Sequence, residues 1–370
     1  MKHLITIMKS LIMIGVLLFS ITTAQSQTQK EFISSINKEI PIALEKNNVP
    51  GLALAIIENG NVILKNGYGF ANVALQKKVT TKDGFNIGSI SKMFTAWGIM
   101  KLVEQRKVDL DAPVSNYLKS WSIPNSEYND SKVTVRRVLN HSAGLTVHGY
   151  NGYNAKNEVP SLKTSLNGGK SENEKVTLFV EPGTKWKYSG GGYSILQLLI
   201  EEVSGVSFEK FMKKNIFKPL KMKNSSFTID KKVLKRTAKA YNEKGEQIPL
   251  RLFAAKAAAG LHTTLEDLIL FAQATMNPNR VLNSKSIKIM TTATEISRGD
   301  YGLGYMIMNR FGNFTLTGHG GSNEGWHSGF MLDLKSNSGI IILTNGSNGR
   351  RVLFKNLQTW AKWHGKNLNN

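Results

Sequence analysis

Cysteine is absent from all 370 residues of the sequence. Its absence excludes disulfide bonds, thiolate nucleophiles and cysteine-ligated zinc, so the fold must depend on its apolar core. Hydrophobic residues make up 41% of the chain and aromatic residues 9%, a composition that is ordinary for a globular protein and argues against disorder.

Long apolar runs are scarce too, and the longest candidate is the run 11–21 near the start of the chain. Lys2 and Lys9 precede it, and small residues follow it as far as Ala24. This order of basic, apolar and small residues is typical of a secretory signal peptide. As a helix the run rises about 16 Å, which is too short to cross a bilayer. We therefore expect residues 1–24 to be a signal peptide and the mature chain to be periplasmic or secreted, with no stable membrane span.

Acidic residues are few. The sequence has 26 aspartates and glutamates against 48 lysines and arginines, so its formal net charge is +22. A charge of this size favours association with polyanions. The basic residues are spread along the chain rather than gathered in one arm, which argues against a nucleic acid partner. In an exported protein the favoured partners are anionic envelope polymers or lipid head groups, and the alternative is that the charge serves solubility alone.

Hydrophobic spacing predicts strands and helices at both ends of the chain. A helical pattern over 32–44 is followed by two apolar runs, 52–57 and 61–65, joined by an Asn-Gly turn that favours a hairpin. Near the other end the pattern predicts four antiparallel strands and a closing helix, at 305–309, 314–317, 329–334, 339–344 and 350–363.

Between about 90 and 300 the spacing is mostly helical, and it predicts helices at 93–105, 193–203, 208–216 and 264–276. We therefore predict an α+β fold in which an antiparallel sheet is flanked by the N- and C-terminal helices and a mostly helical lobe is inserted in it. In this prediction residues 25–370 form one catalytic domain. The cleft between the sheet and the lobe is then the default place for chemistry.

Three serines, Ser35, Ser89 and Ser207, are each followed by a lysine three residues later. Residues three apart lie on one helix face, so a hydroxyl and an amine at this spacing can meet. The pairs at 35 and 207 fall in polar helical stretches and are typical of a surface. Ser89 and Lys92 instead follow Gly88 where an apolar segment gives way to a helix, and free N–H groups at such a point stabilise an oxyanion. This context predicts a Ser89 nucleophile that Lys92 deprotonates, with burial lowering the pKa of the lysine.

Two glycine-rich segments carry further candidates. Tyr188 stands just before the glycines 190–192 and a helix, which suits either a core tyrosine or a hydroxyl that relays protons beside the serine. The second segment follows a strand and consists of His319, Gly320, Gly321 and Ser322. It suits either a tight turn with a surface histidine or a strand edge against which a substrate backbone lies, with His319 facing the site.

A serine and lysine three apart, a later tyrosine, and a basic residue followed by glycine occur here in the order found in penicillin-recognising serine hydrolases. Over nearly all of its mature length the sequence most resembles their class C β-lactamase-like branch, which includes D,D-peptidases, D-aminopeptidases and esterases. Residues 138–145, Val-Leu-Asn-His-Ser-Ala-Gly-Leu, and residues 181–184, Glu-Pro-Gly-Thr, are similar to further segments of that branch.

The resemblance implies a role for each candidate. Ser89 is the residue that becomes acylated, Lys92 accepts its proton, and Tyr188 passes a proton to the leaving group. The backbone N–H groups of Ser89 and Ser322 form the oxyanion hole. The resemblance implies neither a cofactor nor a metal.

Three positions depart from the pattern of β-lactamases in this family. Gly190 stands where the tyrosine motif usually ends in Asn, His319 where many β-lactamases have Lys, and Gly320 where Thr or Ser is common. Each change removes a polar contact to a β-lactam or to a D-Ala-D-Ala end, and the pull of a neutral histidine on a carboxylate is weaker. Among other histidines, we expect His141 to cap backbone groups in its own turn, and His148 is a weaker candidate for the border of the cleft.

The leading hypothesis is an exported serine hydrolase that forms an acyl-enzyme on Ser89 with a small-molecule or peptide substrate. A peptidase of the D-Ala or D-amino-acid type, or an esterase, ranks above a serine β-lactamase. The alternative from another class is a non-catalytic protein that holds envelope polymer through its charge. An α/β-hydrolase is disfavoured because the chain contains no Gly-x-Ser-x-Gly.

Overall fold

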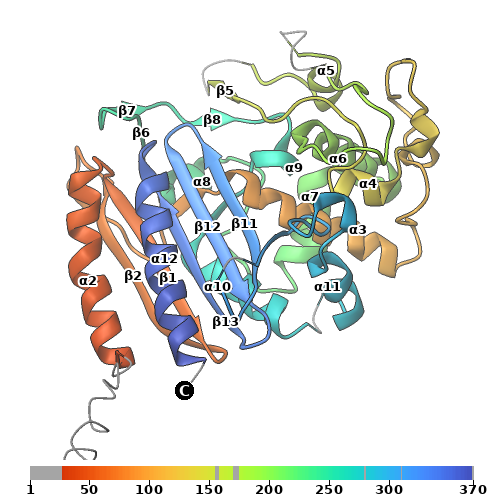
Figure 1. Cartoon of the computed structure of the whole chain (residues 1–370). Helices are drawn as coiled ribbons and strands as arrows, with labels where there is room; N and C mark the ends of the chain where they lie inside the picture. Colours follow the sequence, from red (N-terminus) through yellow and green to blue (C-terminus); the bar gives the residue numbers. More distant parts are fainter. Residues whose placement is uncertain (1–26, 155–157, 170–174, 279–280, 310, 369–370) are drawn as a thin grey trace, which may run out of the picture.

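The computed structural model describes residues 27–154, 158–169, 175–278, 281–309 and 311–368 (Figure 1). The predicted signal peptide, residues 1–24, lies outside the described residues and stays a prediction. Within the described ranges, no helix combines the length and the apolar character needed to cross a membrane.

A seven-stranded antiparallel sheet joins the two ends of the chain, in the order β10-β11-β12-β13-β1-β2-β3. The hairpin of β1 and β2 pairs with the last strand, so that Leu52 in β1 lies opposite Thr344 in β13. The strand bounds are β1 Gly51–Glu58, β2 Asn61–Asn72, β3 Lys77–Lys78, β10 Met306–Met308, β11 Leu316–Asn323, β12 Trp326–Asp333 and β13 Ser338–Thr344. The sheet and its helices confirm the predicted α+β class.

Both faces of the sheet are covered, which explains why β1 is buried almost throughout. Alternate side chains of a strand point to opposite faces. In β1, Leu52, Leu54 and Ile56 therefore belong to one apolar core, and Ala53, Ala55 and Ile57 belong to the other.

The two end helices α2, Gln29–Lys46, and α12, Gly349–Asn367, cover the first of these cores (Figure 1). A capping box between Thr28 and Glu31 starts α2. The rings of Phe32 and Trp363 stack with their centroids 4.2 Å apart, which joins the two helices. The described chain therefore begins and ends on the same face of the sheet.

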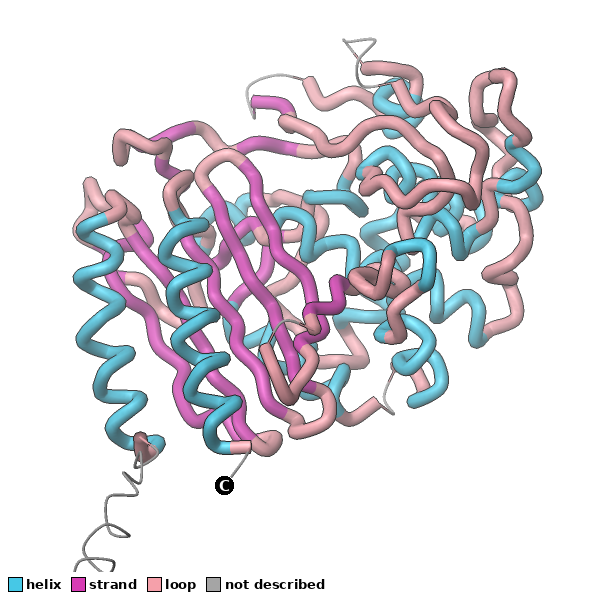
Figure 2. Tube along the Cα trace, viewed as in Figure 1, coloured by secondary structure: helices cyan, strands magenta, loops and turns pink. Residues whose placement is uncertain are grey.

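The other face carries the helical lobe and several short strands (Figure 2). Its helices are α3 Ser91–Glu104, α4 Val135–Leu139, α5 Leu162–Leu166, α6 Gly190–Ser204, α7 Phe208–Met212, α8 Lys231–Arg236, α9 Lys256–Ala259, α10 Leu265–Met276 and α11 Ser284–Thr291. The short strands are β4 Gly84–Asn86, β5 Tyr153–Asn154, β6 Ala240–Tyr241, β7 Gln247–Ile248, β8 Arg251–Leu252 and β9 His262–Thr264.

Helix α3 runs through the middle of this lobe and is buried over most of its length. Its ring Phe94 stacks on Phe271 of α10 at 4.0 Å, and Trp97 donates a hydrogen bond to the Tyr305 hydroxyl at 2.7 Å. A helix that is apolar on all sides is a core helix. The first turn of α3 is therefore held rigidly at the border between lobe and sheet.

Two elements differ from their predicted bounds. The strand predicted at 314–317 continues through the glycine-rich segment to Asn323, because Gly320 and Ser322 pair with residues of β12. The helix predicted at 208–216 is an α-helix only to Met212 and continues as a π-helical turn, Lys213–Phe217.

Candidate active site

Ser89 lies in a 3-10 turn, Gly88–Ile90, that leads directly into α3. Only glycine suits position 88, because its φ is +51° and a Cβ there would lie 2.7 Å from the backbone nitrogen of Ser322. Asn86 supports the turn by accepting the Gly88 N–H at 3.0 Å. The backbone N–H of Ser89 has no hydrogen-bond partner within the described part of the chain. A serine hydroxyl and a free N–H thus lie together at the start of a helix and beside β11.

Lys92 points back from α3 toward this serine. Its Nζ lies 3.1 Å from Ser89 Oγ and donates a hydrogen bond to the Ala258 carbonyl oxygen at 2.7 Å. The side chain is 2% exposed and lies over the rings of Tyr188 and Tyr193, and it forms no ion pair with any described carboxylate. Burial lowers the pKa of Lys92 to about 7. A large fraction of the lysine is therefore neutral near pH 7 and free to take a proton from Ser89.

Tyr188 stands on the loop that precedes α6, with its ring centroid 4.9 Å from Lys92 Nζ. The ring packs against those of His141 at 4.2 Å and His148 at 5.1 Å. Its hydroxyl oxygen is buried and makes no hydrogen bond to another described residue. Burial raises the pKa of Tyr188. The tyrosine is thus a neutral phenol with its proton available beside the serine.

A buried chain of hydrogen bonds links the Tyr188 loop to β11. The Ser189 N–H donates to His141 Nδ1 at 3.0 Å, so a neutral His141 carries its proton on Nε2 and donates to the Tyr301 hydroxyl at 3.2 Å. Tyr301 then donates to His319 Nε2 at 3.0 Å, and His319 Nδ1 donates to the Gly320 carbonyl oxygen. Each group in this chain has one consistent role as donor or acceptor.

Both histidines in the chain are held neutral. Burial, followed by the charge of Lys92, lowers the pKa of His319 to about 3. Burial is also the main cause that lowers the pKa of His141 well below its usual value. A charged histidine would break the donor order of the chain, so the low pKa values and the hydrogen bonds agree.

The outer edge of β11 is open beside Ser89. Strand β10 pairs only with residues 316–318, so no described strand pairs with this edge from His319 to Asn323. A Cβ on Gly321 would lie 2.0 Å from the Ile87 carbonyl oxygen, whereas a Cβ on Gly320 would have nothing nearer than 3.9 Å. Gly321 therefore serves close packing against the serine segment, and Gly320 leaves room for a ligand along the edge.

The structure thus brings Ser89, Lys92 and Tyr188 together and sets residues 319–322 beside them. His319 is not a surface histidine: its ring lies on the side of the site, 6.0 Å from that of Tyr188, but it is 3% exposed and both of its ring nitrogens have protein partners. It positions the strand and offers no free N–H to a ligand. Trp326 is also buried, in edge-to-face contact with Phe85.

Comparison with known proteins decides the family. The family described as Beta-lactamase matches residues 36–361. This chain belongs to the Beta-lactamase family.

Individual relatives of this Beta-lactamase family chain are distant in sequence. Protein flp of Staphylococcus aureus (strain N315) is 26% identical over 318 residues, which are 84% of this chain and 62% of flp. The chain therefore spans about three fifths of the length of that relative. A solved structure of the octameric penicillin-binding protein homologue from Pyrococcus abyssi matches with a TM-score of 0.74 at 28% sequence identity. The match covers 85% of this chain and 74% of the Pyrococcus chain. The D-amino acid amidase from Ochrobactrum anthropi SV3 shares the fold, with a TM-score of 0.73 at 22% sequence identity. The match covers 91% of this chain and 100% of the amidase chain.

Packing in this Beta-lactamase family fold explains why position 190 is a glycine. A Cβ at position 190 would lie 3.0 Å from the His148 carbonyl oxygen and 3.4 Å from Gly149 Cα. The Gly190 N–H donates to that same carbonyl oxygen at 3.1 Å. The loop around His148 therefore occupies the space that a longer side chain would need, and the missing amide is built into the fold.

Two site residues, Tyr301 and Asn86, were not predicted from the sequence, and the role expected of His141 was wrong. Tyr301 joins two histidines, and Asn86 holds Gly88 and also accepts the Asn323 amide at 2.6 Å. His141 caps the backbone of the Tyr188 loop rather than its own turn, which corrects the expectation for it. The only sequence signal was the position of His141 inside the family segment 138–145. Among the described residues no group of three or more His, Asp or Glu side chains is placed to hold a metal ion.

Proposed function

We propose that this protein is a serine hydrolase that works through an acyl-enzyme on Ser89. The observation that carries the proposal is the contact of 3.1 Å between Ser89 Oγ and the Nζ of a buried Lys92 whose pKa is lowered to about 7. A nucleophile and a base within hydrogen-bond reach, with the base in turn fixed by another group, are typical of nucleophilic catalysis. Here the Ala258 carbonyl fixes the base.

The first half of the reaction uses the groups in order. Neutral Lys92 accepts the Ser89 proton while Ser89 Oγ attacks the acyl carbon of the substrate. The negative oxygen that develops lies at the start of α3, near the free N–H of Ser89 and the backbone of Ser322. The tetrahedral species collapses as the proton passes through the Tyr188 hydroxyl to the leaving amine or alcohol.

In the second half, water replaces the leaving group. Tyr188 and Lys92 remove its proton, the water oxygen attacks the acyl carbon, and Ser89 leaves with a proton returned from Lys92. The roles reverse those of acylation, as the same geometry requires.

For the substrate, we propose peptides of the D-amino-acid type or esters ahead of β-lactams. Position 190 has no room for an amide side chain, His319 is neutral and occupied, and Gly320 carries no hydroxyl. A β-lactam or a free carboxylate terminus thus loses three polar contacts, and buried polar recognition is what gives strict selectivity. We also propose that residues 1–24 act as a signal peptide and that the mature chain is exported.

A fluorophosphonate probe followed by peptide mass spectrometry tests the nucleophile. We expect a single adduct on Ser89, and Ser89→Ala should remove both the adduct and the turnover of an ester substrate. Ser35→Ala is the matched control, since Ser35 also precedes a lysine by three residues but its hydroxyl bonds the Phe32 carbonyl within α2. An intact, folded protein that takes no adduct would contradict the proposal.

Incubation with a penicillin separates the substrate classes. Slow or absent turnover of the penicillin beside rapid cleavage of an ester or a D-amino-acid amide supports peptides and esters as the substrates. Fast, repeated turnover of the penicillin would instead make the protein a serine β-lactamase.

A further inference from the structure

One stretch of the chain carries a large share of the net charge. Residues 210–239 contain eleven lysines and arginines and a single acidic residue, Asp230, in a chain whose net charge is +22. Although basic residues occur along the whole chain, they are densest in this stretch. It covers most of α7, the π-helical turn after it, a loop, and α8.

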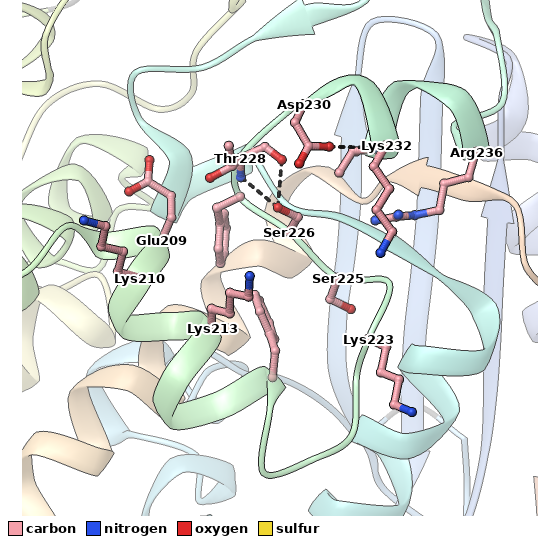
Figure 3. Close-up of a pocket in the computed structure, with 13 residues that line it drawn as sticks. Glu209, Lys210, Lys213, Lys223, Ser225, Ser226, Thr228, Asp230, Lys232 and Arg236 are labelled. Atoms are coloured by element: carbon pink, nitrogen blue, oxygen red, sulfur yellow. Dashed lines mark hydrogen bonds between the residues drawn. The ribbon is translucent and has the colours of Figure 1, made fainter.

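This stretch folds around a hollow of about 290 Å³, which we call the basic pocket (Figure 3). Its cationic lining consists of Lys210, Lys213, Lys223, Lys232 and Arg236. Figure 3 shows Lys213 on one side of the open space and Lys232 and Arg236 on the other. The four lysines are exposed and Arg236 is partly buried.

Arg236 of the basic pocket interacts electrostatically with Asp267 and Asp230, whereas the four lysines have no such close partner among the described residues. None of the four lysines forms an ion pair within 4.0 Å in the part of the chain that the structure describes. Of the two carboxylates in the lining, Glu209 is engaged by Lys256, and Asp230 accepts the Val233 N–H at 2.8 Å as the cap of α8. The four lysines thus have no close negative charge beside them, and a bound anion would supply one.

The wall of the basic pocket is shaped by an unusual helix. The α-helix α7 changes to the π-helical turn Lys213–Phe217 at the pocket itself. Such turns are rare and occur frequently at functional sites. This local irregularity is independent of the charge count and marks the same place.

We propose that the basic pocket binds a linear polyanion whose repeating units carry phosphate groups. Lysine ammonium groups bind phosphate as point charges, and cations on three segments can surround one group. Positive charge continues beyond the pocket, at Lys214, Lys218, Lys221, Lys231, Lys235 and Lys239. A ligand with one charge leaves these unused, whereas a chain of phosphates engages them in turn.

The burial of the aromatic rings in the pocket wall favours a polymer without bases. Proteins that hold single-stranded nucleic acid stack its bases on exposed aromatic rings. The rings in this wall, Phe217 and Phe227, are each only 2% exposed and stack on each other with centroids 5.8 Å apart. They are committed to the core and leave only cations for recognition.

The basic pocket also lies beside a second hollow. The two share Phe227 and Thr228, and the second hollow extends to Gly260. Gly260 directly follows α9, whose Ala258 carbonyl holds Lys92. Only this covalent neighbourhood connects the second hollow to the proposed catalytic segment, and polymer binding in the basic pocket does not depend on the hydrolase proposal.

The test is titration of the whole protein with sodium polyphosphate at several salt concentrations. The pocket variant is Lys213→Gln with Lys232→Gln, and the control is Lys335→Gln with Lys362→Gln, two lysines outside the stretch 210–239. We expect the pocket variant to bind about tenfold more weakly and to lower the slope of log K against log salt by about two. The control should bind like the wild type, and Ser89 labelling should be the same in all three.

Four results would overturn the proposal. An equal loss in both variants would show attraction by net charge alone. Inorganic phosphate that binds as tightly as the polymer would reduce the basic pocket to a small-anion site. An oligonucleotide of equal charge that binds more tightly, or binding confined to anionic vesicles, would assign it to nucleic acid or to a lipid surface. Loss of Ser89 labelling with intact polymer binding would leave this proposal standing and remove only the hydrolase.

Discussion

At the scale of single residues, the site depends on one lysine kept without its usual counter-charge. Lys92 is buried between two tyrosine rings, and Tyr188, the proposed proton relay, is kept neutral by burial as well. A charged ammonium is disfavoured there, because desolvation penalises the charged form. The apolar surroundings therefore make a base of a side chain that is an acid in water.

The activity should consequently rise with pH. Because the neutral form of Lys92 is the base and its pKa is about 7, log kcat/KM should climb by about one per pH unit below pH 7 and level off above it. Lys92→Arg should be inactive at every pH, since guanidinium does not deprotonate in proteins. Steady-state rates of ester cleavage between pH 5 and 9, at about half-unit steps, measure both curves. A variant with arginine that keeps the wild-type profile would show that another group is the base.

Tyr301 is a positioning residue that acts through two histidines. Tyr301→Phe should leave His141 Nε2 and His319 Nε2 buried without a partner, which lowers the free energy of unfolding by about 1–3 kcal/mol. We expect kcat to fall by about tenfold to a hundredfold as Tyr188 and β11 lose their alignment, with KM changing less.

A tyrosine on the other face of the sheet provides the control. The Tyr68 hydroxyl donates to Asn37 Oδ1 at 2.7 Å and belongs to the core beneath the end helices, away from this chain of hydrogen bonds. Tyr68→Phe should lose some stability and keep its kcat. Urea denaturation and steady-state kinetics on both variants separate the two effects, and equal losses of kcat would refute the positioning role.

The contact between Ser89 and Lys92 could be predicted from the sequence, and the contacts that position this pair could not. Ser89 and Lys92 lie within one turn of helix, so their spacing in the sequence is their spacing in space. His141 and Tyr301 are 160 positions apart and meet only when the lobe closes on the sheet. Nothing local in either segment marks that contact.

At the scale of elements, two neighbouring glycines of β11 have different roles. Gly321 allows close packing against the serine segment, and Gly320 leaves open space along the strand edge. Both have ordinary φ angles, so alanine fits the backbone at either position. Gly321→Ala should be destabilising by roughly 3 kcal/mol or more, because its Cβ would lie 2.0 Å from the Ile87 carbonyl oxygen. Gly320→Ala should change stability by less than about 1 kcal/mol and raise KM, since its Cβ enters the open space along the edge.

Thermal denaturation and steady-state kinetics distinguish the two variants of β11. The pair is matched, because each adds one methyl group to the same strand. A stable, fully active Gly320→Ala protein would mean that substrate does not lie along this edge.

The elements themselves followed from the sequence where the pattern is strong. The helix at 32–44 and the strand at 339–344 have periodic apolar residues, and the structure confirms them as α2 and β13. The extension of β11 through glycines was one of two possibilities that the sequence left open, because glycine has a low strand propensity and the pairing with β12 decides the outcome. Likewise the π-helical turn after Met212 has no signal in apolar spacing.

At the scale of the whole molecule, a buried ionic cluster fastens the last helix to the sheet. His364 in α12 lies 2.9 Å from Glu58 Oε2 and 3.2 Å from Asp333 Oδ2. Burial lowers the pKa of His364, but hydrogen bonds to Asp333 and Glu58 outweigh it and raise the pKa to about 9. The cluster joins β1, β12 and α12, which come from both ends of the chain.

Stability should therefore depend on pH through His364. A histidine with a raised pKa contributes fully below its unfolded value of about 6.5, and the contribution disappears as pH rises through about 9. The difference in unfolding free energy between wild type and His364→Gln should be roughly 3 kcal/mol near pH 6 and shrink toward pH 9.

Another residue of α12 gives the control for this measurement. Lys355→Gln breaks an exposed pair with Glu39 at 3.1 Å, so it should change stability by less than about 1 kcal/mol at any pH in this range. Denaturant titrations at several pH values compare the variants. A His364→Gln difference that stays constant up to pH 9 would show that the histidine is not charged in the fold.

The pairing of β1 with β13 has a consequence for synthesis of the protein. Leu52 finds its partner Thr344 only after almost the whole chain has left the ribosome, so the middle of the sheet forms last. Until then β1 and the inner face of α2 remain exposed, a state prone to aggregation. A nascent chain that stops before β13 thus has no route to the native state, and a cell that makes this protein must shield its first apolar strand for nearly the full time of translation.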